Sequence, residues 1–293
     1  MLLWPDCIPC ITGVALRAAR RVIKNEGQVK KFISEVLKIK SLSGENWRIT
    51  SPELIRDIWI KLHEVSGKDD PFKELKIRQN QTALQLLPAV KEFISESSDP
   101  VLEAMKLSIL GNSADVIIDS NVLPTEEMLK KLKEAELNTK NAGMLKKKLK
   151  QSSRLLYFGD NCGEIVFDRL FIEIIREKYG LEVSFVTRTV PVLNDAILSD
   201  ALSVGIDKVA DVIENGIHEP LPGTMLKKAS LDLRALVEES DLIISKGGGN
   251  YDSLTEEKGD LGGKISFLFQ VKCHPIHSIH QIPLGGLEVY NLW

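Results

Sequence analysis

The stretch Gly159-Asp160-Asn161-Cys162-Gly163-Glu164 directly follows the apolar run Leu155-Leu156-Tyr157-Phe158. This pattern is typical of α/β proteins: a short apolar strand ends at an acidic residue and an amide, and a helix with regularly spaced apolar residues follows. In such folds the residues after a buried strand bring polar groups to its carboxyl end and cap the next helix. This stretch therefore predicts an α/β fold with a polar site at the end of a strand.

Two similar transitions follow downstream. Val183-Ser184-Phe185-Val186 leads to Arg188 and then to Asn194-Asp195. Leu242-Ile243-Ile244 leads to Ser245-Lys246-Gly247-Gly248-Gly249-Asn250. Strand ends that carry oxygen ligands, a lysine and a glycine loop together predict a metal ion and a phosphate.

The order of the segments predicts the architecture. After Gln151, β-rich apolar runs alternate with helical ones, which is typical of βαβ units and a parallel sheet. We expect a Rossmann-like three-layer α/β/α core with a parallel-dominated sheet at 151–293, and an all-helical region at 1–150 that contributes to the cleft. The expected strands are 154–158, 182–187, 208–213, 242–245 and 265–271, and the expected helices between them lie near 165–179, 194–204 and 226–238.

Composition excludes several classes of protein. The chain has 293 residues, 43% of them hydrophobic, and a formal net charge of −3, which does not indicate a nucleic-acid binder. It has no run of roughly 18 apolar residues, so no membrane partner is expected. The first residues lack the pattern of a signal peptide, and the 4 cysteines are too few for a disulfide scaffold. We expect a cytoplasmic protein; no feature indicates its oligomeric state.

Asp160, Asn161 and Asp195 form the first candidate site. Two carboxylates and an amide carbonyl are hard oxygen ligands, which suit Mg²⁺ or Mn²⁺. The alternative is that Asp160 caps a helix and Asn161 fills a turn, since both are common capping residues.

Lys246 and the glycines after it form the second candidate site. Glycines allow positive φ angles and let backbone N–H groups approach an anion, and a lysine beside them is a point charge for phosphate. The loop is neither a Walker A motif nor a dinucleotide-binding motif. A plain flexible turn is the alternative, although the polar run Asn250-Tyr251-Asp252 places donors beside the loop.

Cysteines and histidines give weaker signals. Cys7 and Cys10 resemble half of a zinc site, but no second Cys-x-x-Cys follows, so buried thiols, a redox pair or a metal site shared by two chains remain open. His274, His277 and His280 are spaced by three residues. Pro275 and Pro283 argue against a regular helix there, and an extended segment would not bring three imidazoles to one metal.

The motifs taken together resemble one family over nearly the whole chain. They are Cys-x-x-Cys near the N-terminus, Gly111-Asn112-Ser113-Ala114-Asp115, GDNCGEIVFD from 159, RTVPVLNDA from 188, SKGGGNYDSL from 245, and Lys272. This combination resembles the metal-dependent damage-control phosphatases, formerly a domain of unknown function, in the archaeal and bacterial branch that carries the N-terminal Cys-x-x-Cys.

The resemblance implies roles for individual residues. Asp160, Asn161 and Asp195 would hold a divalent cation, with Mn²⁺, Co²⁺, Ni²⁺ or Mg²⁺ as candidates. The expected substrate and phosphate contacts are Lys246, Gly247, Asn250 and Lys272, with Asn112 and Asp115 facing the cleft from the helical half. Glu164 and Arg188 are further candidates for substrate contact. The family usually has Gly-Gln-Gly after the lysine, whereas this chain has Gly247-Gly248-Gly249.

The expected activity is hydrolysis of small phosphate esters, such as sugar phosphates or damaged phosphometabolites. A divalent ion would activate water, Asp160 or Asp195 would orient it, and Lys246 with the loop amides would stabilise the transferring phosphoryl group. An aspartyl-phosphate route through Asp160 is the variant. The alternatives are a carboxyl methyltransferase dependent on S-adenosylmethionine, and a non-catalytic protein that binds a metal or a phosphometabolite.

Overall fold

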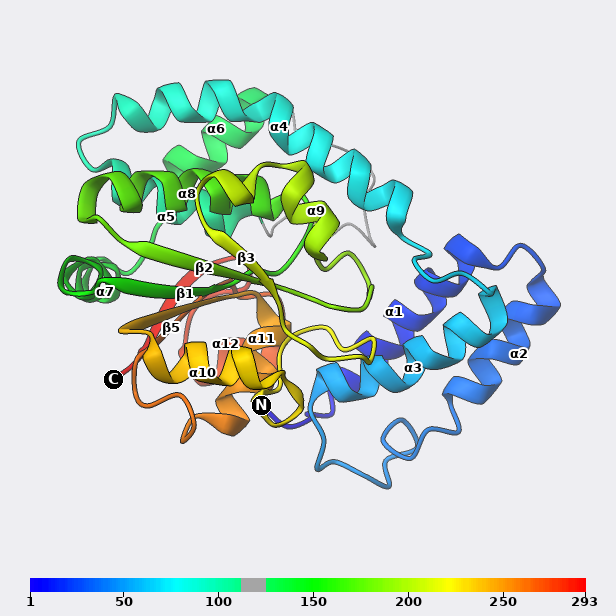
Figure 1. The fold of residues 1–293 in the computed structure, drawn as a ribbon. Coiled ribbons are helices and arrows are strands. Elements are labelled where there is room, and N and C mark those ends of the chain that lie inside the picture. The colour runs from blue at the N-terminus through cyan, green and yellow to red at the C-terminus, as the bar shows by residue number, and fades with distance from the viewer. Residues whose placement is uncertain (112–124) are drawn as a thin grey trace.

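The structure is a computed structural model, and it describes residues 1–111 and 125–293 (Figure 1). A six-stranded sheet lies at its centre, with the strand order β3-β2-β1-β4-β5-β6. All neighbouring strands are parallel except β5 and β6, which are antiparallel. The strands are β1 (Arg154–Phe158), β2 (Glu182–Thr187), β3 (Asp211–Glu214), β4 (Leu242–Lys246), β5 (Ile265–Gln270) and β6 (Leu287–Leu292). This is the Rossmann strand order, so the predicted fold class is confirmed.

Alternate residues of the strands pack into two different cores, because side chains along a strand point to opposite faces. Leu155 and Tyr157 of β1 belong to the core on one face, whereas Leu156 and Phe158 belong to the core on the other. The helices on the first face are α4 (Lys73–Ser95), α5 (Pro100–Leu110), α6 (Thr125–Glu134), α7 (Thr139–Gln151), α8 (Glu164–Tyr179) and α9 (Leu198–Ser203). Those on the second are α10 (Leu231–Glu239), α11 (Gly248–Leu254) and α12 (His274–His280). Figure 1 shows the resulting three layers.

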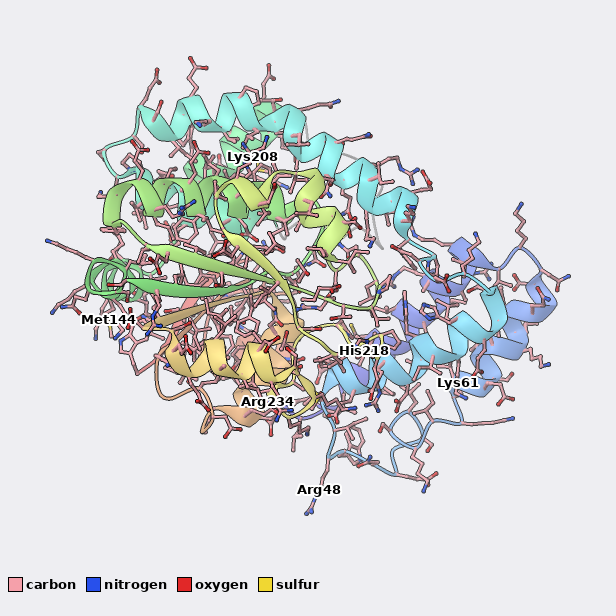
Figure 2. The ribbon with its side chains drawn as sticks, in the orientation of Figure 1. Arg48, Lys61, Met144, Lys208, His218 and Arg234 are labelled. Atoms are coloured by element: carbon pink, nitrogen blue, oxygen red, sulfur yellow. The ribbon has the colours of Figure 1, made fainter. Side chains whose placement is uncertain are left out.

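The first three helices form a unit with its own core. They are α1 (Cys7–Val22), α2 (Glu26–Val36) and α3 (Ser51–Ser66). Trp59 and Phe72 pack against each other in this core with ring centroids 5.3 Å apart, and Val192 of the α/β half also packs into it. Figure 1 shows the unit beside the sheet, and Figure 2 shows Arg48 pointing away from it. Val192 lies three residues before Asp195, so the helical unit contacts the loop that carries a predicted site residue.

Several predicted elements need correction. The segment with the three histidines is a helix, α12. Pro275 does not prevent it, because it lies in the first turn, where the backbone N–H has no partner within the helix. The glycine loop starts another helix, α11, and β6 was not predicted. The helix expected at 194–204 is only α9, and a 3₁₀ turn at Ile206–Lys208 shifts β3 to a later start than predicted.

None of the helices within residues 1–111 and 125–293 combines the length and the apolar character that crossing a bilayer requires.

Candidate functional site

The candidate site lies where the strand order reverses, between β1 and β4. Chain connections leave these neighbouring strands in opposite directions, which opens a crevice at their carboxyl ends. Asp160 follows β1, and Gly247 follows β4. Gly247 has a φ of +79°, and a Cβ atom there would lie 1.9 Å from Asp160 Oδ2. The carboxylate therefore rests directly against the glycine, and only glycine fits both its backbone conformation and the available space.

The loops after β1 and β2 hold the predicted metal ligands together. Asn161 and Asp195 form an isolated antiparallel bridge, and the Asp160 carbonyl accepts a 2.8 Å hydrogen bond from the Ala196 N–H. The Asn161 side-chain amide donates to Asp160 Oδ2 at 2.7 Å. The structure thus brings Asp160, Asn161 and Asp195 to one place, although they come from two different strand ends.

Arg188 lies between the two carboxylates. Its Nε donates to Asp195 Oδ2 at 2.7 Å, and one of its terminal nitrogens lies 3.3 Å from Asp160 Oδ1. The third contact is to Thr224 Oγ1, at 3.3 Å. The guanidinium is 2% exposed, so it acts within the site rather than in a surface ion pair.

Burial makes negative charge unfavourable at this position. Desolvation, followed by the nearby charges of Asp195 and Glu164, raises the pKa of Asp160 to about 8, while Arg188 and Lys272 act in the opposite direction. Desolvation also raises the pKa of Asp195, against the lowering effect of Arg188. A cation bound beside two buried carboxylates would stabilise their charged forms.

Lys246 occupies a second, fully buried charge cluster. Its ammonium donates to the Ser108 carbonyl at 2.7 Å, to Asp168 Oδ1 at 2.8 Å and to the Glu164 carboxylate. The side chain is 0% exposed. In this arrangement the ammonium contacts protein groups beneath the crevice, so its predicted contact with phosphate would require it to exchange partners.

Glu164 and Asn250 support the loop that carries the ligands. The Glu164 carboxylate accepts a 3.3 Å hydrogen bond from the Asn161 N–H and also pairs with Lys246. The Asn250 amide donates to the carbonyls of Gly159 at 3.0 Å and Lys246 at 2.8 Å, and so joins the ends of β1 and β4. Its Oδ1 atom is buried and accepts no hydrogen bond from the described residues.

The remaining predicted residues differ in how they are placed. Lys272 is exposed and close enough to Asp160 for its charge to lower the pKa of that carboxyl. Asn112 and Asp115 lie outside the described residues.

Three residues of the site were not predicted. Thr224 contacts Arg188, Asp168 pairs with Lys246, and Asn80 Oδ1 accepts a 2.6 Å hydrogen bond from the Gly163 N–H. The available signal for Thr224 was the preceding Gly223, which has a φ of +108° and whose Cβ would lie 2.5 Å from the Gly249 carbonyl oxygen. Asn80 lies on a long helix, where nothing in the sequence distinguishes it from a surface polar residue, whereas Asp168 ends the GDNCGEIVFD stretch but was assigned no role.

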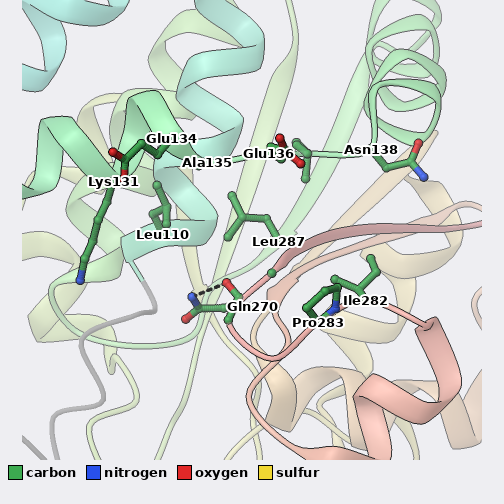
Figure 3. Close-up of a pocket in the computed structure, with 13 residues that line it drawn as sticks. Leu110, Lys131, Glu134, Ala135, Glu136, Asn138, Gln270, Ile282, Pro283 and Leu287 are labelled. Atoms are coloured by element: carbon green, nitrogen blue, oxygen red, sulfur yellow. Dashed lines mark hydrogen bonds between the residues drawn. The ribbon is translucent and has the colours of Figure 1, made fainter.

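A cavity of about 840 Å³ adjoins the carboxyl end of β5 (Figure 3). The register pairs Leu268 of β5 with Lys246 of β4, so Gln270 lies two residues beyond the level of Lys246. The cavity wall mixes apolar and polar side chains, including Leu110, Lys131, Glu134, Gln270 and Leu287.

Histidine and cysteine do not supply an alternative metal centre. His280 Nε2 lies 2.9 Å from the Tyr251 hydroxyl, and His277 Nδ1 lies 2.7 Å from the Ile282 carbonyl oxygen. Over the described residues, no three His, Cys, Asp or Glu side chains are arranged to hold a metal ion. The predicted ligand set differs from such a group because one of its members is the amide of Asn161.

Comparison with known proteins gives the family. The family model described as the damage-control phosphatase ARMT1-like domain matches residues 3–286. The chain belongs to this family. A damage-control phosphatase from Archaeoglobus fulgidus is 32% identical, with 94% of each chain covered. An uncharacterized protein from Methanocaldococcus jannaschii is 34% identical, over 93% of this chain and 90% of its own.

A solved structure supports the same relationship. The crystal structure of a DUF89 family protein from Pyrococcus horikoshii matches with a TM-score of 0.87 and 26% identity, covering 100% of both chains. The curated damage-control phosphatase from that organism is 28% identical over 96% of this chain. Membership of the family supports a phosphatase-type function.

Proposed function

We propose that this protein is a metal-dependent phosphatase that hydrolyses small phosphate esters, such as sugar phosphates or damaged phosphometabolites. The observation that carries the proposal is the pair of buried carboxylates, Asp160 and Asp195, held at the strand-order reversal with the Asn161 amide beside them. Membership of the damage-control phosphatase family supports the reaction class.

The donor set fits a divalent cation. Asp160, Asn161 and Asp195 offer carboxylate and amide oxygens, the ligands that Mg²⁺ and Mn²⁺ prefer, and Co²⁺ and Ni²⁺ are further candidates. Among the described residues, Arg188 pairs with both carboxylates, and burial raises the pKa of both. A bound divalent ion would stabilise their charged forms, polarise a phosphoryl oxygen and lower the pKa of a coordinated water.

The protein's own groups have separate tasks in this proposal. Asp160 and Asp195 fix the ligand geometry and orient the attacking water, while Arg188 keeps the two carboxylates apart and aligned. Lys272 is exposed beside Asp160 and supplies positive charge toward the phosphoryl group. Gly247 has no side chain of its own, so its backbone lies against the Asp160 carboxylate and the ester would bind beside both. The ester is a small phosphorylated metabolite, and its phosphoryl group is the part that these residues recognise.

Lys246 acts on the ligand loop indirectly, through Glu164. Its ammonium holds Glu164, and Glu164 accepts the Asn161 N–H, so the lysine positions the ligand loop through two hydrogen bonds. We therefore assign Lys246 and Glu164 as positioning residues, and Asn250 as the link between the ends of β1 and β4.

The experiment is a metal-dependent assay. The purified chain is stripped of metal and incubated with p-nitrophenyl phosphate and with sugar phosphates, in the presence of Mn²⁺, Co²⁺, Ni²⁺ or Mg²⁺ in turn. We expect phosphate release that requires the metal and that Asp195→Ala abolishes. Asp207→Ala, on an exposed turn, is the matched control and should keep the wild-type rate. Absence of metal-dependent turnover across the whole panel would contradict the proposal.

A further inference from the structure

The fold gathers three of the chain's 4 cysteines around the start of helix α1. Cys7 and Cys10 lie in its first turns, and Cys273 immediately precedes α12. Cys273 is close enough to both Cys7 and Cys10 to interact with them electrostatically. All the cysteines lie in the described part of the chain, and each is a thiol. Neither the catalytic crevice nor its proposed mechanism uses them.

The start of α1 is fixed to the α/β core. The Met1 ammonium donates to Thr255 Oγ1 at 2.9 Å and to the Asp252 carbonyl, and it lies 3.2 Å from the Glu256 carboxylate. Ser51 of α3 donates to the Asp252 carboxylate. Because these contacts hold the chain on both sides of Cys7, the thiols keep a defined environment.

Cys7 and Cys10 have the geometry of a dithiol. From the rise and radius of an α-helix, residues separated by three positions have Cα atoms about 5 Å apart, within the range of about 4.4–6.8 Å that a disulfide requires. The two thiols also differ in access. Cys10 is exposed, whereas Cys7 is half-buried and its Sγ accepts the Trp4 N–H at 3.4 Å.

We propose that Cys7 and Cys10 form a redox-active dithiol, which low-molecular-weight disulfides oxidise to a disulfide within α1. Cys10 is the entry thiol because solvent reaches it, and Cys7 is the resolving thiol because it lies one helical turn away. This site is separate from the proposed phosphatase chemistry, and its existence does not depend on that activity.

The reaction proceeds by two thiol–disulfide exchanges. The Cys10 thiolate attacks one sulfur of glutathione disulfide, the S–S bond breaks, and one glutathione thiolate leaves. The Cys7 thiolate then attacks the Cys10 sulfur of this mixed disulfide, forms the Cys7–Cys10 bond and releases the second glutathione thiolate. Two protein thiols are oxidised and one glutathione disulfide is reduced to two thiols, whose sulfurs take up the two protons that the cysteines lose.

The dithiol has a matched set of variants. In the Cys7→Ser variant the second exchange cannot occur, so the Cys10–glutathione mixed disulfide should accumulate at least about tenfold over wild type, because a neighbouring thiol acts at an effective concentration in the millimolar range. In the Cys10→Ser variant the entry thiol is missing and little glutathione should be attached. The Cys273→Ser variant should still form the Cys7–Cys10 bond. Cys162, only 2% exposed, is the internal control and should stay reduced.

The experiment is an equilibration of the folded chain with graded ratios of reduced to oxidised glutathione, followed by acid quenching, alkylation and peptide mass spectrometry. We expect a peptide that contains an internal Cys7–Cys10 disulfide, with Cys162 fully alkylated. Three results would overturn the proposal. They are a Cys7–Cys273 bond as the main product, a Cys10 mixed disulfide that persists in wild type, and Cys7 and Cys10 that stay reduced at every glutathione ratio at which Cys162 stays reduced.

Discussion

Two buried charge clusters lie on either side of the turn between β1 and α8, and each combines one cation with two carboxylates. In one, Arg188 contacts Asp160 and Asp195; in the other, Lys246 contacts Glu164 and Asp168. The formal charges are the same, so composition alone would not separate the two clusters. Their positions and their hydrogen-bond partners do.

The Lys246 cluster is enclosed by protein. Asp168 Oδ1 accepts hydrogen bonds from the Tyr157 hydroxyl at 2.8 Å and the Ser108 hydroxyl at 2.9 Å, in addition to the ammonium. Desolvation, opposed mainly by Lys246, raises the pKa of Asp168 to about 6. Removing the ammonium would leave two buried carboxylates without their counter-ion, so we assign this cluster a structural role.

The Arg188 cluster lies at the carboxyl ends of the central strands β1 and β2. Its members come from the loops after β1 and β2, at the reversal of strand order where α/β folds bind ligands. The pKa of Asp160 is raised further than that of Asp168, to about 8. The comparison teaches that the burial of two carboxylates at the strand-order reversal, rather than the number of charged residues, indicates where a cation would bind.

The largest expected effect comes from removing a carboxylate of the Arg188 cluster. Asp160→Ala and Asp195→Ala should each abolish metal-dependent phosphatase activity, because each deletes a proposed metal ligand. Circular dichroism and thermal melting should show a retained fold, since the lost carboxylate is unfavourable in its buried position. Wild-type turnover in either variant would contradict the assignment of that residue.

The Lys246 cluster should respond through stability instead. Lys246→Met leaves Glu164 and Asp168 buried without their cation, which should lower the free energy of unfolding by about 3–5 kcal/mol. Urea denaturation measures this, and Lys246→Met combined with Asp168→Asn should recover part of the loss. If Lys246→Met lost activity while unfolding at the wild-type urea concentration, the lysine would act on phosphate directly, as its motif first suggested.

Gly247 tests how closely the two strand ends must approach. In Gly247→Ala the new methyl group would occupy the space of Asp160 Oδ2, so the carboxylate must move. We expect metal affinity to fall about 10–100-fold, the range typical of disturbed support around a metal ligand. Isothermal titration with Mn²⁺ measures this. Gly248→Ala is the control, because nothing lies within 4 Å of a Cβ at that position, and an equal loss there would show that the effect is not specific.

The last expected effect is a pH dependence of stability in the metal-stripped protein. The folded-state pKa of Asp160, about 8, is raised above its usual value of 3.8, so its contribution to stability is fully present below pH 3.8 and is lost as the pH rises through 8. Asp160→Asn does not titrate. Its advantage over wild type in urea denaturation should therefore grow between pH 5 and pH 8.5, and saturating Mn²⁺ should reverse it. A difference that stays constant with pH would contradict the raised pKa.

The sequence predicts the α/β half well where strands are short apolar runs that end in polar residues. β1 and β2 agree with the expected ranges because each is bounded by a charged residue and a site loop. β6 escaped prediction because Glu288 and Asn291 interrupt its apolar residues, and the strand exists through pairing with β5. Such long-range pairing overrides local preference.

The site could be predicted only in part, for a similar reason. Asp160, Asn161 and Asp195 stand at strand ends, where chain order alone implies that they meet. The role of Lys246 depends on its contacts with Ser108 of α5 and Asp168 of α8, and no local sequence pattern predicts those contacts. Arg188 was expected as a candidate for substrate contact, yet it is among the largest fully buried side chains and pairs with Asp160 and Asp195.

The most direct test of the central claim is a Mn²⁺ titration of the metal-stripped chain, followed by electron paramagnetic resonance of the free ion. We predict that wild type binds Mn²⁺ at a single saturable site, that Asp195→Ala loses this binding, and that Asp168→Asn retains it. The opposite pattern, with binding kept in Asp195→Ala and lost in Asp168→Asn, would show that the cation belongs to the Lys246 cluster and would contradict the account.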